Sequence, residues 1–252
     1  MLTTRISVLF LVLALGHASL AQAQAAPERR WSVDFGLGWD KGVSGNINSS
    51  AIGTLNDQTV VILKNKYEDV YGTGLNLRFG GGYLIREHSE LRVTFTLQSL
   101  DADLTRMGDF GASNLYGEYD DYQSFGIDVG FRQYAPMRPG ILGYGEATIG
   151  LAFIDETDVT LSAPAANFTA DASDFYDRTA AFTFGVNVGV LFDIQSATTG
   201  MVSNLGVFTQ VGLRYVSGMS QVDALVGTGL DSINDSSARW AMPFTAGMRL
   251  RF

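Results

Sequence analysis

Apolar and polar residues alternate strictly along the C-terminal segment 240–252. The apolar positions are Phe252, Leu250, Met248, Ala246, Phe244, Met242 and Trp240, and the residues between them include Arg251, Arg249, Gly247 and Thr245. This period of two predicts a β-strand with one apolar face and one polar face. Such a strand is typical of a membrane-spanning β-barrel, whose wall contacts lipid outside and polar groups inside.

The same alternation returns along the rest of the chain. Further strands are predicted over residues 31–40, 70–86, 91–98, 124–132, 146–153, 182–193 and 207–215. We therefore expect an all-β protein, a transmembrane antiparallel up-and-down β-barrel of about eight strands, an even number as in single-chain bacterial barrels. Residues 59–64 have the pattern of a strand extension above the membrane or of a separate hairpin. If they belong to two further membrane strands instead, the count becomes ten. Pro243 lacks an N–H within its strand, which indicates a bulge near the outer rim.

Short and long connections alternate between the predicted strands. The short ones lie near 87–90, 135–140 and 195–204, and the long ones near 41–69, 99–121, 154–175 and 217–237. Outer-membrane barrels have short periplasmic turns and longer extracellular loops. The pattern therefore predicts that the long loops are extracellular and that both chain ends are periplasmic.

The N-terminal residues have the features of a secretory signal peptide. A cationic start at Arg5 precedes an apolar run over residues 6–15, and Ala21 and Ala23 form an A-x-A site. We expect a signal peptide over 1–23, cleaved after Ala23 or Ala25, then a short linker over 24–30 and the barrel over 31–252. A membrane anchor is the alternative, but about ten apolar residues are too few to span a bilayer as a helix.

Composition agrees with a barrel and excludes several kinds of chemistry. Charged residues make up 17% of the chain, against about a quarter in soluble domains. Cysteine is absent, which excludes disulfides, cysteine-based zinc sites and cysteine nucleophiles. A net charge of -9 argues against a nucleic-acid partner, because phosphate binding requires a basic surface.

Ten charged residues fall on the polar, inward face of their strands. They are Asp34, Arg78, Arg92, Asp128, Arg132, Glu146, Asp193, Arg214, Arg249 and Arg251. We expect Asp34 to pair with Arg249 or Arg251 and Arg132 to pair with Glu146. The set indicates either a gated, ion-lined passage or a salt-bridged plug. We favour the plug, because an eight-stranded barrel is only just wide enough for its own side chains; inward glycines would either leave room for water or serve close packing.

Aromatic residues are expected to form girdles at the two edges of the apolar band. The candidates are Trp31, Trp39, Tyr71, Tyr83, Phe153, Phe192, Tyr215 and Trp240. Trp31 and Trp39 are separated by roughly 26 Å along a strand. With the strand tilted, this separation approximately spans an apolar band about 25 Å tall.

Catalysis and metal binding have little support in the sequence. His88 is the only histidine beyond the predicted signal peptide, and it lies with Glu87, Ser89 and Glu90 in a predicted turn. Neighbouring turn residues seldom align as nucleophile, base and orienting group. The long loops are acidic, for example at Glu118, Asp120 and Asp121, but none has the spacing of a calcium loop. We expect no catalytic residues, no cofactor and no metal site.

Four segments carry a resemblance to a known family. Residues 31–39, 81–85 with 91–93, 144–152 and 245–252 resemble the outer-membrane β-barrel family that includes opacity proteins and the membrane domain of outer membrane protein A. The resemblance implies a barrel-assembly signal in the last strand, which the insertion machinery would recognise. Its residues are Phe244, Ala246, Met248, Leu250 and Phe252.

Together these features predict a bacterial outer-membrane location and a non-enzymatic function. We expect a structural or surface-contact role for the acidic extracellular loops, with outer-membrane lipid and lipopolysaccharide as partners and the extracellular partner left open. A narrow porin-like channel for small solutes or ions is the main alternative. A lipid-modifying barrel enzyme is the second alternative.

Overall fold

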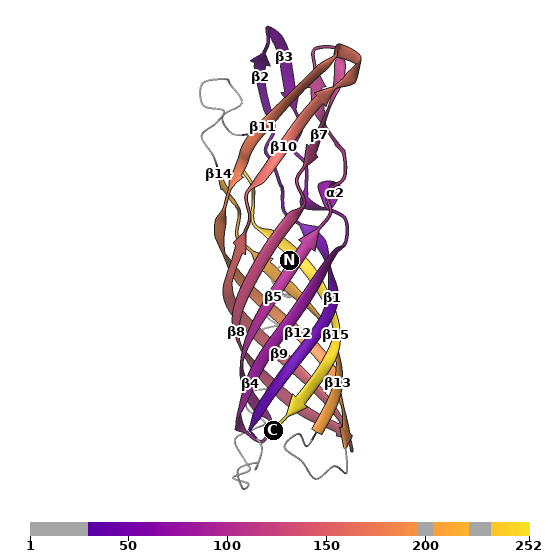
Figure 1. Cartoon of the computed structure of the whole chain (residues 1–252), viewed down its shortest axis with the longest axis vertical. Helices are drawn as coiled ribbons and strands as arrows, with labels where there is room; N and C mark the ends of the chain where they lie inside the picture. Colours follow the sequence, from indigo (N-terminus) through magenta and orange to yellow (C-terminus); the bar gives the residue numbers. More distant parts are fainter. Residues whose placement is uncertain (1–29, 196–203, 222–232) are drawn as a thin grey trace, which may run out of the picture.

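The computed structural model describes residues 30–195, 204–221 and 233–252 and shows a closed barrel. Eight antiparallel strands follow one another around the wall in the order β1-β15-β13-β12-β9-β8-β5-β4 (Figure 1). Their bounds are β1 Trp31–Ser44, β4 Gly74–Arg86, β5 Ser89–Leu100, β8 Tyr122–Arg138, β9 Ile141–Ile154, β12 Thr179–Gln195, β13 Asn204–Val216 and β15 Arg239–Arg251. The predicted eight-stranded, all-β barrel is confirmed.

Closure of the barrel joins the first strand to the last. β1 pairs with β15 from Ser32 opposite Arg251 onward, and the backbone N–H of Phe252 donates to the carbonyl of Trp31. The described start and end of the barrel therefore lie at the same end of the molecule. The connection from β4 to β5 and the one from β8 to β9 turn at this end, which we call the turn end.

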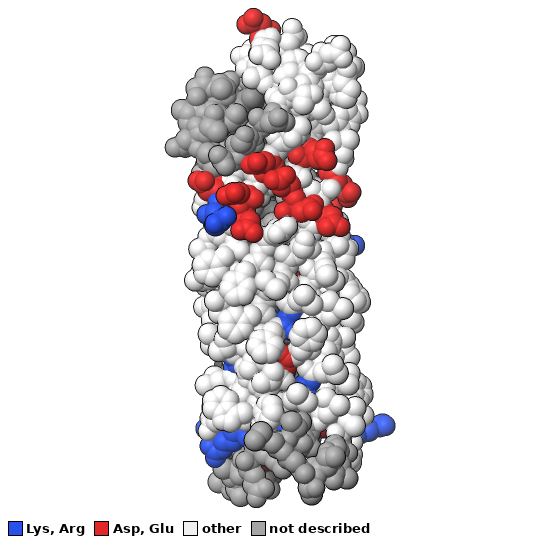
Figure 2. All heavy atoms as spheres, viewed as in Figure 1, with Lys and Arg blue, Asp and Glu red and all other residues white. Residues whose placement is uncertain are grey.

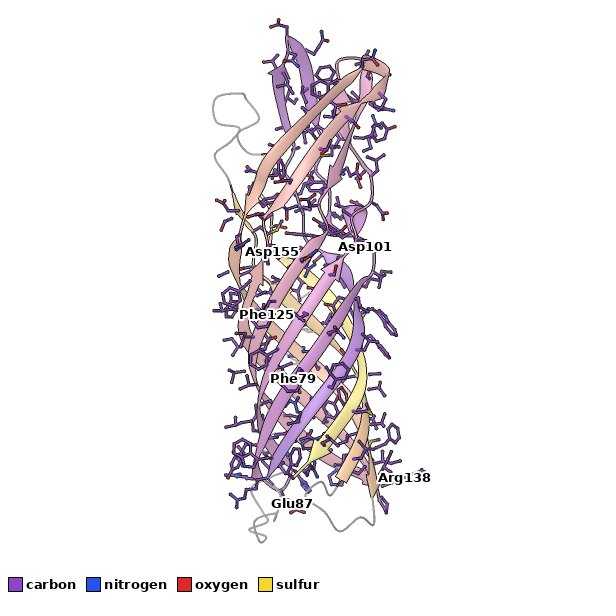
Figure 3. All side chains as sticks on the ribbon, in the orientation of Figure 1. Phe79, Glu87, Asp101, Phe125, Arg138 and Asp155 are labelled. Carbon is purple, nitrogen blue, oxygen red and sulfur yellow. The ribbon has the colours of Figure 1, made fainter. Side chains whose placement is uncertain are left out.

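Each barrel strand alternates between exposed and buried side chains, as the period of two requires. On β1, Phe35 is 52% exposed and Leu37 is 50% exposed, whereas Asp34 is buried. Exposed apolar side chains occur on all eight barrel strands. On the face shown in Figure 2 they form a nearly uncharged belt, which Phe79 and Phe125 mark in Figure 3. A belt this large, exposed on a folded protein, indicates contact with lipid.

Beyond the other end of the barrel, the long connections fold into a second sheet. Its seven strands run in the order β14-β11-β10-β7-β6-β3-β2. Their bounds are β2 Ala51–Leu55, β3 Gln58–Ile62, β6 Thr105–Phe110, β7 Ser113–Tyr119, β10 Thr157–Ala163, β11 Phe168–Asp177 and β14 Ser220–Gln221. With the short helices α2 (Tyr67–Val70) and η1 (Pro164–Ala166), this sheet forms what we call the extension, seen above the barrel in Figure 1.

The extension has a hydrophobic core of its own. Ile47, Val60, Ile62, Met107 and Leu115 are each at most 1% exposed and belong to one apolar cluster. Tyrosines complete this cluster, and burial raises the pKa of the Tyr119 hydroxyl. The long connections therefore form a packed β structure.

Residues 59–64 overlap β3, which forms a hairpin with β2 in the extension, as expected, and also pairs with β6. The alternative count of ten barrel strands is wrong. Three other expectations about local structure are corrected. The second barrel strand begins at Gly74, because residues 67–70 form α2. The β4–β5 turn is confined to residues 87–88, and the β8–β9 turn to residues 139–140. Pro243 lies opposite Asp40 in unbroken register, and the irregularity of this pair of strands falls between Gly42 and Ser44.

Among the described residues, none of the helices is both long enough and apolar enough to cross a membrane. The predicted signal peptide and residues 24–29 of the linker lie outside the described residues, as do 196–203 of the third short connection.

Candidate functional site

The barrel interior contains the charged residues that the alternation assigns to it. Of the predicted set, seven are buried: Asp34, Arg92, Asp128, Arg132, Glu146, Arg214 and Arg249. Arg78, Asp193 and Arg251 are partly buried, the last two at the turn end. The interior of the barrel is therefore the candidate site.

Six of the interior groups form one connected cluster, which we call the interior network. Its members are Asp34, Glu90, Arg92, Arg132, Glu146 and Arg249. Arg132 Nε donates to Glu146 Oε2 at 2.6 Å, and Arg249 Nε lies 3.7 Å from Asp34 Oδ1. Arg92 Nη2 lies 2.6 Å from Asp34 Oδ2 in a further ion pair. Three arginines face three carboxylates, so the network is electrically balanced.

Glu90 belongs to this network, although its place in the sequence suggested a solvated turn. Its side chain is completely buried and forms an ion pair with Arg249. Tyr134 Oη donates to Glu90 Oε2 at 2.7 Å, and Ser32 donates to the other carboxylate oxygen. Strand β5 begins at Ser89, so Glu90 has the same inward parity as Arg92. Extending the alternation by one step toward the turn would have found it.

Two further levels of polar contacts lie nearer the extension. Arg214 Nη2 lies 3.3 Å from Asp128 Oδ2, and Thr183 donates to the same carboxylate at 2.6 Å. Above them, Asp40 accepts from Asn76 at 2.8 Å and from Gln98.

Arg239 completes the level nearest the extension. It donates to Gln98 at 3.0 Å, and its guanidinium lies 4.3 Å from the ring centroid of Tyr122. Asp40 and Arg239 were not among the predicted interior charges, although both continue the inward parity of their strands.

Apolar layers close the interior at both ends. Near the turn end, one apolar layer, which we call the floor, is formed by the packed side chains of Leu84, Tyr134, Tyr144, Leu191 and Phe208. Toward the extension, a ceiling of rings and aliphatic side chains continues into the hydrophobic core, with Leu100 and Tyr122 at 1–2% exposure. The charged levels are therefore enclosed between two apolar layers.

The space left between these side chains is small. One cavity of about 20 Å³ lies beside the interior network, and one of about 10 Å³ lies beside Arg78 and Arg214. Each has room for little more than a water molecule. Inward glycines make this close packing feasible: a Cβ at Gly126 would lie 2.8 Å from Arg214 Nη2, and one at Gly82 would overlap the Glu90 carboxylate. The described interior has the dense packing expected of a plug.

The charges between floor and ceiling do not fully balance. The described interior there holds five carboxylates and six arginines. The carboxylates are Asp34, Asp40, Glu90, Asp128 and Glu146, and the arginines are Arg78, Arg92, Arg132, Arg214, Arg239 and Arg249. Asp193 and Arg251 at the turn end contribute one charge of each sign. The interior therefore has one positive charge in excess.

The turn around His88 does not assemble a catalytic triad. Ser89 Oγ donates to Gln133 at 2.8 Å, while His88 Nε2 lies 3.9 Å from Glu87 Oε1. Glu90 points into the interior network instead. No group of three or more potential metal-binding side chains occurs among the described residues.

The predicted girdle residues lie on the outer wall, with one exception. Trp31 packs on Tyr83 near the turn end, with ring centroids 4.8 Å apart. Nearer the extension, Trp39 stacks on Phe244 at 4.6 Å, and Trp240 packs against Tyr215 at 5.3 Å. Phe153 and Phe192 are also exposed, at 42% and 43%.

Tyr71 does not belong to the girdle. It is 3% exposed and lies in the core at the base of the extension, where it donates to the carbonyl of Asp120. The backbone leaves the strand between α2 and Gly74, so the parity counted along β4 does not continue to Tyr71.

Charged residues gather above and below the apolar belt. Figure 2 shows a band of acidic side chains where the barrel meets the extension, and Figure 3 places Asp101 and Asp155 at this level. We call this band the acidic collar; its exposed members include Glu68, Asp69, Asp101, Asp103, Asp120, Asp121, Asp155 and Glu156. At the turn end, Arg86 and Arg138 are exposed. The side chains of Asp171, Asp174 and Asp231 lie outside the described part of the structure.

Comparison with known proteins gives matches among solved structures only. No protein-family model and no curated protein matches the sequence. Neisserial surface protein A is similar, with 12% identity, a TM-score of 0.46, and coverage of 88% of this chain and 97% of its own. The outer membrane protein OprG from Pseudomonas aeruginosa has 9% identity, a TM-score of 0.43, and coverage of 92% and 99%. The outer membrane protein AlkL has 10% identity, a TM-score of 0.41, and coverage of 92% and 94%.

Proposed function

We propose that the protein is a non-enzymatic scaffold of the bacterial outer membrane, whose closed barrel carries the extension as a surface-contact module. The observation that carries this proposal is the filled interior: the interior network lies between an apolar floor and an apolar ceiling. A conducting pore requires a continuous water path, whereas the cavities beside these charges measure about 10 and 20 Å³. The apolar belt supports the membrane location.

The first experiment tests whether the barrel is closed. Purified protein refolded in detergent is added to a planar lipid bilayer, and current is recorded across a range of voltages and salt concentrations. We expect no discrete conductance steps, because buried ion pairs and apolar layers obstruct the interior. Folding of the same sample is checked by circular dichroism. Reproducible steps from folded protein would support the channel alternative and contradict the scaffold.

The charge distribution supports an orientation with the extension outside the cell. The exposed Arg86 and Arg138 lie at the turn end, where they would meet anionic phospholipid headgroups of the inner leaflet. Short turns on the periplasmic side are the usual arrangement in outer-membrane barrels. The acidic collar would then lie at the level of the lipopolysaccharide headgroups.

Single cysteines test this orientation directly, since the chain contains none of its own. Ile52→Cys places a thiol on β2, where Ile52 is 71% exposed, and Glu87→Cys places one in an exposed turn. A membrane-impermeant maleimide should label Ile52→Cys in intact cells and Glu87→Cys only after the outer membrane is permeabilised. The reverse pattern would place the extension in the periplasm.

The last strand is proposed to act as the assembly signal. Phe244, Ala246, Met248, Leu250 and Phe252 lie on the outward parity of β15 and its C-terminal end. Because they share this parity, they would present one apolar face of the strand to the insertion machinery. Strand β15 pairs with both β1 and β13, so its docking is also the step that closes the barrel.

A further inference from the structure

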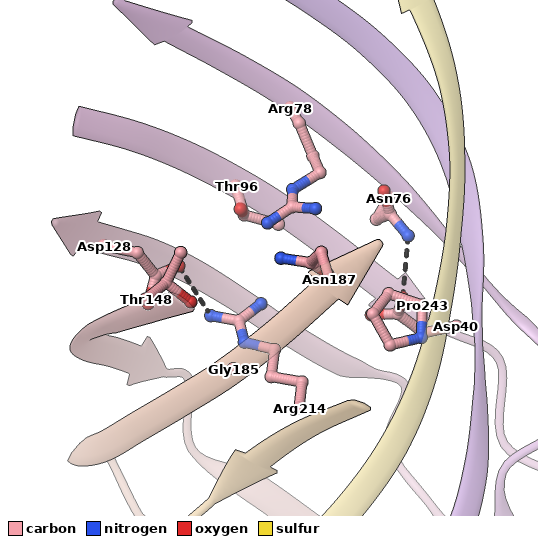
Figure 4. A pocket seen from close by; sticks show the side chains of 10 residues that line it. All are labelled: Asp40, Asn76, Arg78, Thr96, Asp128, Thr148, Gly185, Asn187, Arg214 and Pro243. Atoms are coloured by element: carbon pink, nitrogen blue, oxygen red, sulfur yellow. Dashed lines mark hydrogen bonds and ion pairs between the residues drawn. The ribbon is translucent and has the colours of Figure 1, made fainter. Parts of the chain in front are cut away.

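A groove of about 340 Å³ lies on the outer wall of the barrel. The interior cavities are far smaller: the one shown in Figure 4 measures about 10 Å³, and two arginines and two carboxylates line it in electrical balance. The outer groove is lined by Leu75, Leu77, Leu97 and Phe125, with Asp155 at its polar end. Figure 3 shows Phe125 in the apolar belt and Asp155 above it. The groove therefore lies where the belt meets the acidic collar.

The register of three strands explains why the wall is hollow at this place. Ser99 on β5 lies opposite Leu75 on β4 and opposite Gln123 on β8. Its side chain is shorter than the leucine, valine and phenylalanine side chains at the outward positions of β5 in the belt. A notch therefore remains between its neighbours. Phe125 stacks on Phe95, with ring centroids 6.1 Å apart, which holds one wall of the groove in place.

The mouth of the groove carries both signs of charge. Arg178 Nε lies 3.5 Å from Asp155 Oδ1, and Arg178 Nη2 lies 3.7 Å from Glu156 Oε2. The side chains of both acids are 60% exposed and that of Arg178 is 68% exposed, so all three are accessible to a ligand. The backbone N–H of Asp155 donates to the carbonyl of Gln123 at 3.1 Å. Gln123 and Ser99 thus place uncharged polar groups between the charged mouth and the apolar wall.

This order of groups matches a phospholipid whose headgroup carries an amine. We propose that the groove binds one acyl chain of a zwitterionic phospholipid of the phosphatidylethanolamine class. The ester groups then lie near Ser99 and Gln123, the phosphate near Arg178 and the ammonium near the two carboxylates. The groove has room for roughly ten methylene groups, if each occupies about the 30 Å³ of a liquid water molecule. The inference rests on the proposed membrane location, and it holds for either orientation of the barrel.

The charge of the mouth disfavours an anionic lipid. Two carboxylates, Asp155 and Glu156, face the single guanidinium of Arg178, which leaves one negative charge in excess. Phosphatidylglycerol and lipid A add phosphate without a cation, whereas the ammonium of phosphatidylethanolamine offsets a carboxylate. Lipid tails are as apolar as leucine, so burial of the chain gives no preference among lipids. One exposed charge pair contributes up to about a fivefold preference.

Native mass spectrometry of the whole refolded protein tests the groove. The protein in detergent is mixed with phosphatidylethanolamine, and the lipid that stays bound is counted as the collision energy is raised. We expect one retained lipid in the wild type and its loss in Ser99→Leu, which fills the notch. Val188→Leu is the matched control and should retain the lipid, because Val188 is 62% exposed on β12, which β9 separates from β8. Equal retention by Ser99→Leu and the wild type would overturn the proposal.

Competition among lipids tests the mouth. From an equal mixture of phosphatidylethanolamine, phosphatidylglycerol and lipid A, we expect phosphatidylethanolamine to be retained most, and Asp155→Asn to reduce its preference over phosphatidylglycerol by up to about fivefold. Glu87→Gln, at the exposed turn end, should leave the preference unchanged. Equal retention of phosphatidylglycerol, or displacement by lipid A, would overturn the assignment. Conductance steps would contradict the scaffold without altering these lipid results, so the two proposals fail separately.

Discussion

Replacing Glu90 by alanine is expected to lower the free energy of unfolding by about 3–5 kcal/mol, the usual cost of removing one partner from a buried ion pair. Glu90 is completely buried, and its loss leaves Arg92 and Arg249 with one carboxylate too few. Tyr134 also loses the acceptor of its hydroxyl. The measurement is reversible urea unfolding in lipid vesicles, followed by the fluorescence of the three tryptophans.

Glu87→Ala is the matched control for this prediction. Glu87 is the same residue type, three positions earlier, but it is exposed in the turn. We expect its replacement to change stability by no more than about 0.5 kcal/mol. Equal effects of the two substitutions would show that Glu90 belongs to a solvated turn, as its sequence neighbourhood suggests.

A double-mutant cycle tests the pair itself. Arg249→Met combined with Glu90→Ala should cost clearly less than the sum of the two single substitutions, because the second removes a charge that the first has left unpaired. Additive losses would mean that the two side chains contribute to stability independently.

Replacing Ile149 by arginine is expected to destabilise the barrel by about 2–4 kcal/mol, the cost of a cationic side chain near the middle of a bilayer. Ile149 is 55% exposed on β9 and lies beside the outward residues Val129 and Phe184. Its exposed surface therefore contacts lipid in the proposed orientation. The free energy of unfolding is measured in vesicles, as for Glu90.

Ile52→Arg is the control that distinguishes a position exposed to lipid from a position exposed to water. Ile52 is also an exposed isoleucine in a strand, but β2 belongs to the extension. Arginine there should change stability by about 0.5 kcal/mol or less, because the side chain extends into water. Similar small effects at both positions would contradict a lipid-facing belt.

The interior residues were predictable from the sequence because the wall of a barrel separates two environments. Every second residue faces lipid, so the polar residues of opposite parity must face the interior. This argument found Asp34, Arg132 and Glu146, and it proposed two pairings that the structure contains. It missed Glu90 because turn residues surround it, and the exact end of a strand depends on hydrogen bonds to its neighbour.

The inward glycines illustrate what parity alone does not decide. The sequence left open whether they admit water or permit close packing. Gly82 lies where a Cβ would overlap Glu90, and Gly126 lies against the guanidinium of Arg214. Each glycine makes room for a side chain from another strand, and the strand register that brings the two together is a property of the closed barrel.

The extension is the largest feature that local sequence patterns did not predict. Its strands join separate connections, through the pairs β3 with β6, β7 with β10 and β11 with β14. Residues 59–64 were expected to extend a strand or to form a hairpin above the membrane, but the pattern did not indicate that β3 also pairs with β6 from another connection. Tyr71 was placed in the girdle for the same reason, since its burial depends on contacts made with other loops.

The alternation in the sequence was enough to predict the all-β class, a barrel of about eight strands and the inward parity of its charges, because lipid and interior impose a period of two on every membrane strand. The folded structure was needed to show that Glu90 joins the interior network and that the long connections fold into a second sheet. These properties depend on which side chains meet across the barrel once it closes, and residues distant in the sequence supply them.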